Sequence, residues 1–250
     1  MLKLSALGKR FGTRWILRDL NLEVQTGECV ALLGPSGCGK STALRLIAGL
    51  EQPDEGGIEL EGRPLLGIPA ERRRIGMVFQ EPMTALNPVR TIGDQIAEGI
   101  FWHMRVSRAV AAERARTLLD RVGLTRARVT GERYPHQLSG GQRQRVVIAM
   151  AIACRPDLLI ADEPTTALDV TIQAQILALI QEIVDENRMG CLLISHDLAV
   201  VAQMADRVAI MREGEIVESG PTVSLFANLT HPYSRALMAA SNHVPIRARR

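Results

Sequence analysis

Apolar residues follow two patterns along the chain, one typical of buried strands and one typical of helices. Apolar runs without alternation occupy residues 30–33, 157–161 and 191–195. Such runs are typical of strands that are buried on both faces of a parallel sheet. Between the last two runs, isoleucines recur at helical spacing from Ile172 to Ile183, which predicts an amphipathic helix. Strands that alternate with helices in this way predict an α/β core with a parallel sheet.

Other segments predict a small β layer, a helical insert and a polar, helix-prone tail. Strand-like alternation is clearest within residues 1–33, and further strands are expected at residues 58–62, 75–79, 207–211 and 215–218, the last two as a hairpin. From Thr91 to about Ala153 the apolar spacing becomes helical.

One helix of the insert can be outlined in more detail. Ser107 is expected to cap its first turn and Gly123 to end it. Its buried face is expected to carry Val110, Leu118, Leu119 and Val122.

Composition excludes several classes of protein. The chain has 250 residues, 46% of them hydrophobic and 23% charged, which is typical of an ordinary globular protein. The net charge of +3 is spread over both signs without a basic stripe, so no nucleic acid partner is expected. The longest apolar run, Val146–Cys154, is less than half of a bilayer span, and the N-terminus lacks the apolar region of a signal peptide. We therefore expect a cytoplasmic chain.

The four cysteines do not predict a metal site or a disulfide framework. Cys29, Cys38, Cys154 and Cys191 show no CxxC spacing. Buried, small hydrophobic side chains are the expected role.

A glycine-rich stretch lies between the apolar run at residues 30–33 and an apolar-periodic segment at 44–50, which predicts a strand, a loop and a helix. The stretch consists of Gly34, Pro35, Ser36, Gly37, Cys38, Gly39, Lys40, Ser41 and Thr42. It matches the phosphate-binding pattern GxxxxGK[ST] in full. Backbone N–H groups and the positive helix end would bind phosphates, Lys40 the β- and γ-phosphates, and Ser41 Mg²⁺. The sequence therefore predicts binding of ATP with Mg²⁺.

Lys40 also departs from the composition of the chain. The 30 basic residues are almost all arginine, and the only lysines are Lys3, Lys9 and Lys40. A compact ammonium suits a phosphate loop better than a planar guanidinium does.

Polar residues that follow the buried runs are candidates for the chemistry. Asp162 and Glu163 end one run, and His196 follows the next. Ligands of open α/β sheets bind at the carboxyl ends of strands. Asp162 is therefore expected to hold Mg²⁺, Glu163 to act as general base and His196 to contact the γ-phosphate. The alternatives are an acid pair that faces solvent and a structural histidine.

A second anion site is predicted at Leu138–Gln142. This glycine-containing stretch precedes a helix that is expected to begin near Arg143, so its N–H groups and the helix end could bind another phosphate. The alternative is a glycine turn that only caps the helix.

Leu138–Gln142 resembles the signature of ABC-type ATPases, and the resemblance covers nearly the whole chain. In the family's order and spacing it continues through Phe11, Gln80, Leu158–Glu163, Thr166–Asp169 and Ser195–Asp197. It implies a P-loop NTPase (RecA-like) parallel-sheet core with a small antiparallel β subdomain and a helical insert. The implied organisation is a single ABC ATPase domain over 1–250, with a nucleotide-binding core and β subdomain at 1–90 and 155–225, a helical signature subdomain at 91–154 and a C-terminal tail at 226–250.

The resemblance also implies roles for individual residues. The implied catalytic residues are Glu163, His196, Gln80 and Lys40. The implied Mg²⁺ ligands are Ser41, Gln80 and Asp162. The implied contacts of the nucleotide are Phe11 on the adenine, the loop Gly34–Thr42, and Ser139, Gly140, Gly141, Gln142 and Asp169. In the family, two ATPase domains pair head to tail, and each signature closes on the γ-phosphate held by the other domain's loop.

Four further stretches resemble the ATP-binding subunits of bacterial peptide/nickel importers. They are Gln80–Pro88, Tyr134–Gln137, Ala161–Val170 and His231–Tyr233. The chain lacks a cysteine cluster after Cys191, so it is more similar to the short, nickel-type members.

The implied partners are a second ATPase subunit, in a homodimer or a related heterodimer, and two transmembrane permease subunits, with a substrate-binding protein acting indirectly. The implied place is the cytoplasmic face of the inner membrane, as a peripheral subunit. The alternatives are a soluble ABC-type ATPase without a permease and a small-molecule kinase, which would leave Leu138–Gln142 without a role.

Overall fold

The computed structural model describes residues 1–125, 127, 129–166 and 168–240. The described chain forms two compact units, the first from residues 1–73 with those from 187 onward and the second from Arg74–Glu186. The second unit is thus an insertion in the sequence of the first. The division expected from the sequence, with its boundaries at 91 and 154, stays a prediction. Ala167 and residues 241–250, which belong to predicted segments, lie outside the described residues.

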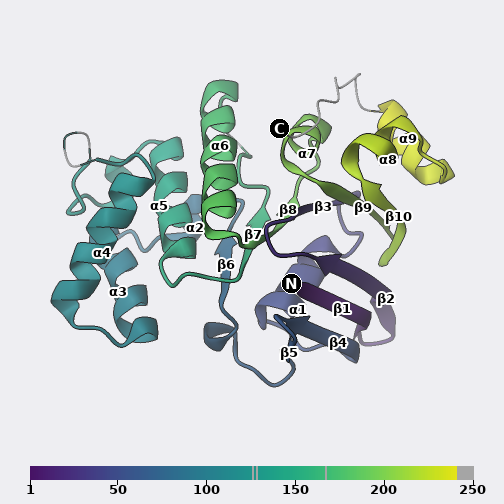
Figure 1. Cartoon of the computed structure of the whole chain (residues 1–250), viewed down its shortest axis with the longest axis horizontal. Helices are drawn as coiled ribbons and strands as arrows, with labels where there is room; N and C mark the ends of the chain where they lie inside the picture. The colour runs from purple at the N-terminus through teal and green to yellow at the C-terminus, as the bar shows by residue number, and fades with distance from the viewer. Residues whose placement is uncertain (126, 128, 167, 241–250) are drawn as a thin grey trace. The chain divides into compact units, whose positions relative to one another are not determined.

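An antiparallel sheet in the first unit corresponds to the predicted β layer. Its strands are β1 (Leu2–Phe11), β2 (Arg14–Val24), β4 (Glu55–Leu60) and β5 (Arg63–Pro64), in the order β2-β1-β4-β5 (Figure 1). Alternate side chains such as Leu2, Leu4, Leu20 and Leu22 are buried, as the alternation predicts.

A parallel arrangement in the same unit is built around β3 (Cys29–Leu33). β8 (Gly190–Ile194) and β9 (Arg207–Arg212) pair with β3 in parallel on its two sides, and β10 (Glu215–Pro221) pairs antiparallel with β9. Every residue of β3 and β8 is buried. The apolar runs therefore form central strands covered on both faces, as predicted.

Helices of the first unit are α1 (Lys40–Ala48), the short 3-10 turn η1 (Ala70–Arg72), α7 (Leu198–Met204), α8 (Thr222–Ala227) and α9 (Pro232–Ala240). Helix α1 ends at Gly49, whose φ of 82° is left-handed. A Cβ at Gly49 would lie 2.4 Å from Nε of the buried Arg73, so this position requires glycine for both backbone and space.

The second unit joins a parallel strand pair to a group of helices. β6 (Ile75–Val78) pairs with β7 (Leu158–Asp162), and the helices are α2 (Pro82–Ala85), α3 (Ile92–Met104), α4 (Arg108–Arg121), the 3-10 turn η2 (Pro135–Gln137), α5 (Gly140–Ile152) and α6 (Val170–Asn187). Figure 1 shows α3, α4 and α5 side by side, and all three pack on one another. Helix α5 also approaches β6 so closely that a Cβ at Gly76 would lie 2.4 Å from the Ala151 carbonyl oxygen.

Some local expectations were wrong at the level of single residues. Of the predicted face of α4, Leu119 and Val122 are buried, whereas Val110 is 42% exposed and Leu118 is only partly buried. Ala111 and Ala115 complete the buried face in their place. Small alanines form this face because α4 packs closely on α3 and α5, and a search for large apolar residues overlooks them. The predicted limits of α4, Ser107 as N-cap and a stop at Gly123, are confirmed within two residues.

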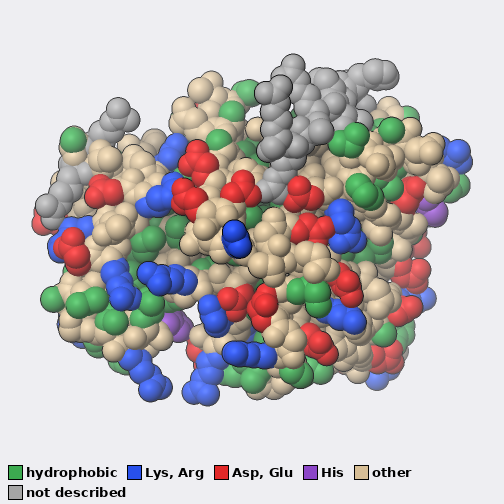
Figure 2. Space-filling model, in the orientation of Figure 1, with side chains coloured by type: hydrophobic (Ala, Val, Ile, Leu, Met, Phe, Trp, Pro, Cys, Tyr) green, Lys and Arg blue, Asp and Glu red, His purple; other side chains and the backbone are tan. Residues whose placement is uncertain are grey.

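Charged side chains of both signs are mixed on the visible face of the described chain, and none of its helices is suited to cross a membrane. Figure 2 shows acidic and basic side chains interspersed on the visible face. Within the described residues, no helix combines the length and the apolar character needed to cross a bilayer.

Candidate functional site

The loop of residues 34–39 connects β3 to α1 and can follow its path only with glycine at both ends. A Cβ at Gly34 would lie 2.5 Å from the Met211 carbonyl oxygen. Gly39 has a φ of 110°, and a Cβ there would lie 2.7 Å from Cδ2 of Leu17. The loop is therefore pressed against β9 and β2, and its glycines allow this close packing.

The phosphate loop combines an uncapped helix start with a positively charged side chain. Gly39 is the N-cap of α1 and has no side chain to cap the helix, so the N–H groups of the first turn lack intrahelical acceptors. Nζ of Lys40 donates to the carbonyl oxygens of Gly34 (2.7 Å) and Pro35 (2.9 Å), which holds the ammonium across the loop. Ser41 is exposed at the start of the helix. Open donors and a cation in one loop fit a chain of phosphates.

Phe11 and His196 are the other predicted site residues of the first unit. Phe11 ends β1 and is 52% exposed, as a residue that stacks on a base must be. His196 is exposed two residues after the end of β8. It stands in a turn fixed on both sides, because Asp197 N–H donates to Ser195 Oγ (3.0 Å) while Asp197 caps α7 through the Ala199 N–H (2.8 Å).

Glu163 of the second unit has its side chain and its backbone held in place. Oε2 accepts hydrogen bonds from Nε2 of Gln80 (2.9 Å) and from Oγ1 of Thr166 (3.0 Å). The residue follows Asp162, the last residue of β7, and adopts a left-handed φ of 45°. The structure thus brings Gln80 and Glu163 together. The sequence analysis included Thr166 in a family motif but gave it no role of its own. Its position three residues after Glu163 was the only indication that its hydroxyl could contact the carboxylate.

The candidate metal ligands are oxygen donors of different types. Among the residues that the structure describes, no group of three or more His, Cys, Asp or Glu side chains could hold a metal ion. Asp162 and Gln80 belong to the second unit and Ser41 to the first. Carboxylate, amide and hydroxyl oxygens are the hard ligands that Mg²⁺ accepts in company with phosphates and water.

The predicted second anion site is the N-terminus of α5. Ser139 is its N-cap, and the helix begins at Gly140, three residues before the predicted start near Arg143. Ser139 Oγ accepts from the Gln142 N–H (3.3 Å), and Gln142 Oε1 accepts from the Ser139 N–H (2.9 Å), which forms a capping box. The glycine turn therefore does cap the helix.

Capping still leaves donors at the start of α5. The N–H groups of Gly140 and Gly141 lie in the first turn, where no intrahelical acceptor exists. A Cβ at Gly141 would lie 2.6 Å from Cγ2 of Ile172, so packing on α6 requires this glycine. Asp169 also has a visible structural role, because its Oδ1 accepts from the Ile172 N–H (3.0 Å) at the start of α6.

The predicted site residues are thus divided between the two units. The first unit carries Phe11, the loop Gly34–Thr42 and His196, and the second carries Gln80, Asp162, Glu163, Ser139–Gln142 and Asp169. Within each unit they lie at strand ends or helix N-termini, where ligands of α/β proteins bind. Their roles in catalysis and binding stay predictions.

A comparison with protein-family models decides the family. The model of the ABC transporter family matches residues 17–166, which include the phosphate loop, Leu138–Gln142 and Glu163. The chain belongs to the ABC transporter family. It is accordingly an ABC-type ATPase that binds ATP.

Similar proteins agree with this assignment. A Brucella melitensis protein named as a peptide import ATP-binding protein is 52% identical over 238 residues, which cover 89% of this chain and 70% of the relative. The glutathione import ATP-binding protein GsiA of Escherichia coli K12 is 50% identical over 240 residues, 90% of this chain. The chain spans only 38% of the length of GsiA. These relatives agree with the resemblance to the peptide/nickel importer subfamily.

Solved structures establish the fold class. The dimeric ATP-binding cassette MJ0796 in a post-hydrolysis state with ADP and Pi has a TM-score of 0.77 and 29% identity, covering 89% of this chain and 99% of its own. The Clostridium perfringens protein cbiO1, part of the ABC transporter complex cbiONQ, has a TM-score of 0.79 and 29% identity, covering 95% and 98%. The ABC cassette form of the P-loop NTPase fold is therefore confirmed.

Proposed function

We propose that the chain is the ATP-hydrolysing subunit of a bacterial importer for peptides or nickel, and that it drives a permease by ATP-dependent dimerisation. The observation that carries this proposal is the presence of two separate helix N-termini with open donors, at α1 and at α5. One triphosphate needs only one such site within a chain. Relatives named for the import of a peptide and of glutathione favour a peptide-like cargo over nickel.

Residues of the first unit would bind the nucleotide. Lys40 and the first-turn N–H groups of α1 would hold the β- and γ-phosphates, because they offer a positive charge and directed donors in one loop. Phe11 would stack on the base. His196 would contact the γ-phosphate from its fixed turn.

Residues of the second unit would perform the hydrolytic step. Glu163 would accept the proton of the attacking water, and the hydrogen bonds from Gln80 and Thr166 would keep its carboxylate oriented. Asp162, with Ser41 and Gln80, would provide oxygen ligands for Mg²⁺. The bound ion supplies charge neutralisation at the β- and γ-phosphates.

The α5 N-terminus would serve a second ATPase subunit rather than the chain's own nucleotide. Ser139, Gly140, Gly141 and Gln142 would contact the γ-phosphate held by that subunit, in a homodimer or a related heterodimer, and Asp169 would lie near the same nucleotide. The dimeric state of the cassette MJ0796 supports this assembly.

The segment from Glu81 to Pro88 would contact the permease at the cytoplasmic face of the membrane. Met83 on α2 is 47% exposed and available to a partner, whereas Leu86 is 4% exposed and belongs to the core. Gln95 fixes the end of this segment by accepting from the Asn87 N–H (2.8 Å) and donating to the Asn87 carbonyl (3.0 Å). Met83 is therefore the sharper probe of coupling.

Purification of the full chain from its own membranes in mild detergent tests the proposal. We expect two permease proteins to copurify, and Met83→Glu to abolish ATP-driven uptake in reconstituted vesicles while basal ATP hydrolysis stays unchanged. Thr117→Glu, on an exposed face of α4, is the control. An active ATPase that copurifies with no membrane protein would instead favour an ABC ATPase that works without a permease.

A further inference from the structure

Lys9 and Phe11 form a cation–aromatic pair at the end of β1. They are two residues apart on one strand, so their side chains leave the same face. Nζ of Lys9 lies over the Phe11 ring, 5.2 Å from its centroid, within the range of a cation–π interaction. The Lys9 side chain is only 12% exposed, whereas Phe11 is 52% exposed. A largely buried lysine side chain therefore lies against an exposed ring.

The ammonium of Lys9 is itself held by oxygen atoms from the segment that follows α1. Nζ donates to the Gln52 carbonyl oxygen (2.6 Å) and lies 3.8 Å from a carboxylate oxygen of Glu51 and 3.8 Å from one of Asp54. With these partners the long side chain keeps one position. These contacts hold the ammonium in place, so the position of the ammonium sets the orientation of the Phe11 ring.

The same segment is fastened to β1 through its backbone. The Asp54 N–H donates to the Gly8 carbonyl oxygen (2.9 Å), and Asp54 Oδ2 accepts from the Arg10 N–H (2.8 Å). The chain that leaves the helix of the phosphate loop is thus tied to the strand that carries Phe11, with Lys9 between them.

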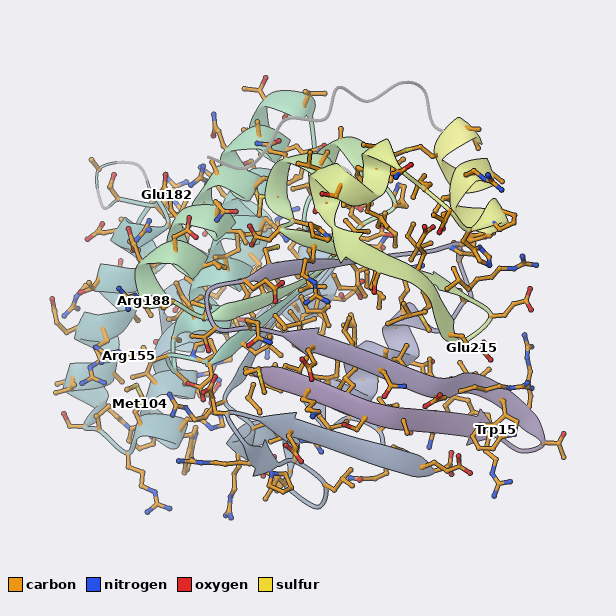
Figure 3. All side chains as sticks on the ribbon, turned by 45° about the vertical axis from the view of Figure 1, so that its right-hand side comes forward. Trp15, Met104, Arg155, Glu182, Arg188 and Glu215 are labelled. Carbon is orange, nitrogen blue, oxygen red and sulfur yellow. The ribbon has the colours of Figure 1, made fainter. Side chains whose placement is uncertain are left out.

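A second cation–aromatic pair on β1 shows the contrast. The Arg10 guanidinium lies 5.6 Å from the Trp15 ring centroid, on the opposite face of the strand, and Trp15 lies near the turn that joins β1 to β2 (Figure 3). Arg10 and Trp15 are register partners across the two strands, so this pair stabilises the hairpin. Lys9 and Phe11, in contrast, lie on one strand and are not register partners of each other, because Lys9 is opposite Leu17 and Phe11 is opposite Arg14. Their contact therefore does not join the two strands of the hairpin.

We infer that Lys9 is a positioning residue for the nucleobase: it fixes the Phe11 ring in the orientation that stacks on the base. The inference rests on the proposed function, in which Phe11 contacts the adenine. An exposed aromatic ring without such support would lose rotamer freedom when the nucleotide binds, and this loss weakens binding. The Lys9 ammonium orders the ring in advance, and its charge also withdraws electron density from the ring that meets an electron-rich purine.

The inference predicts a contribution that depends on the base and not on the phosphates. Lys9 should strengthen the binding of ATP and of GTP, because both present a flat purine to Phe11. It should leave the binding of inorganic tripolyphosphate unchanged, because that ligand reaches only the loop Gly34–Thr42. A residue that merely stabilised the fold would affect both kinds of ligand.

The test is a double-mutant cycle on the full chain with ATP, GTP and tripolyphosphate, measured by competition with a fluorescent ATP analogue. We expect Lys9→Gln to raise the Kd of both nucleotides about threefold to tenfold, as loss of a cation–π contact implies. The Kd of tripolyphosphate should not change, and Lys9→Gln should have no further effect in the Phe11→Ala background. Lys9→Arg should restore most of the affinity, since a guanidinium keeps the charge over the ring.

Lys3→Gln is the matched control, because Lys3 lies on the same strand and its side chain is 44% exposed beside Glu23. Thermal unfolding of each variant separates loss of fold from loss of binding, and Lys9→Met provides a second neutral variant if Lys9→Gln unfolds. Equal Kd values for wild type and both neutral variants would overturn the inference, as would an equal weakening of tripolyphosphate or an undiminished effect in the Phe11→Ala background. A wild-type chain that binds tripolyphosphate but shows no gain from a base would refute the role of Phe11, and failure to bind either ligand would refute the proposed function itself.

Discussion

Glu163 combines a strained backbone conformation with a carboxylate that accepts two side-chain hydrogen bonds. Its φ of 45° lies in the left-handed region, which costs about 1–3 kcal/mol for a residue other than glycine. Such a conformation persists only where the surroundings impose it, and here the Thr166 N–H donates to the Glu163 carbonyl oxygen (3.2 Å) while Gln80 and Thr166 hold the carboxylate. The left-handed conformation of Glu163 thus costs local stability and sets the direction of the carboxylate, which the proposed role as general base requires.

Substitution of Glu163 by Gln should separate binding from hydrolysis. The amide keeps the size of the side chain but cannot accept a proton, so we expect the rate of ATP hydrolysis to fall at least about 100-fold. The Kd for ATP should stay within about twofold of the wild type, because the phosphate loop is unchanged. Phosphate release and equilibrium binding measure the two quantities. Glu182→Gln, at an exposed position of α6, is the control, and full activity of Glu163→Gln would exclude it as the base.

Lys40 should contribute to binding itself. Lys40→Ala removes the only side-chain cation of the loop, and hydrogen bonds to charged groups are each worth about 1.5–3 kcal/mol. We therefore expect the Kd for ATP to rise about 10- to 100-fold, while Lys3→Ala leaves it unchanged. Equilibrium titration with a fluorescent ATP analogue checks this, and an unaltered Kd in Lys40→Ala would contradict the assignment of the loop.

At the scale of elements, the end of α1 depends on a buried arginine. Arg73 is 2% exposed and donates through Nη1 to the carbonyl oxygens of Leu46 (2.7 Å) and Ile47 (2.8 Å), at the negative end of the helix. Burial lowers the pKa of Arg73, but these carbonyls favour its charged form. The helix that presents its start to the phosphates is thus fixed at its other end by Arg73.

Arg73→Met should destabilise the chain through α1. It leaves the Leu46 and Ile47 carbonyls without this donor, so we expect a loss of about 2–4 kcal/mol in the free energy of unfolding. The adjacent Arg72 is exposed, and Arg72→Met should change the stability by no more than about 0.5 kcal/mol. Urea unfolding followed by circular dichroism compares the two, and equal midpoints would refute the role of Arg73.

The C-terminal helix α9 depends on a carboxylate. Desolvation alone would raise the pKa of Glu218, but hydrogen bonds from Thr230 and His231 lower it to about 2. The Thr230 N–H and hydroxyl both lie 2.7 Å from its Oε1. This carboxylate joins β10 to the residues that lead into α9.

The pKa of Glu218 is lower in the folded chain, so its stabilising effect should be present above the ordinary value of 4.5 and disappear as the pH falls toward 2. The protection factors of the α9 amides, which correct the exchange rates for their intrinsic pH dependence, should therefore fall over this range. Glu218→Gln should show low protection factors already at neutral pH and little change below it, because an amide oxygen cannot replace a carboxylate with several donors. Protection factors that are independent of pH in the wild type would contradict this.

At the scale of the whole molecule, the dimer is the decisive expectation. Glu163→Gln with MgATP should elute from gel filtration as a dimer, and Ser139→Glu in the same background should be monomeric because a carboxylate would repel the γ-phosphate. Ser107→Glu is the matched control, since Ser107 caps α4 as Ser139 caps α5. A dimer that forms equally well with Ser139→Glu would exclude the α5 N-terminus from the interface.

Much of the fold followed from the sequence because its signals are local. The unalternating runs at β3 and β8 and the glycine pattern of the phosphate loop depend only on neighbouring residues. The buried alanine face of α4, the three-residue error at the start of α5, and the roles of Arg73 and Thr166 depend on packing partners that periodicity does not report. The phosphate loop, Asp162, Glu163 and His196 were predicted from motif and strand-end position, and Phe11, Gln80 and Asp169 from family resemblance. The contact between Lys9 and Phe11 was not predicted, because it depends on the packing of the segment after α1.

The insertion of the second unit into the first has a consequence for the order of synthesis. β3 is synthesised before β8 and β9. The hydrogen bond from the Cys29 N–H to the Asp206 carboxylate cannot form until Asp206, 177 residues later, has been synthesised. Arg74–Glu186 is continuous and is complete before β8 and β9 exist. At about 5–20 residues per second, the apolar strand β3 and its phosphate loop remain without their neighbours for roughly ten seconds or more. We therefore expect nascent chains stalled between residues 100 and 180 to need chaperone protection over residues 29–48, and a circular permutant that begins at Asn187 to shorten that exposure.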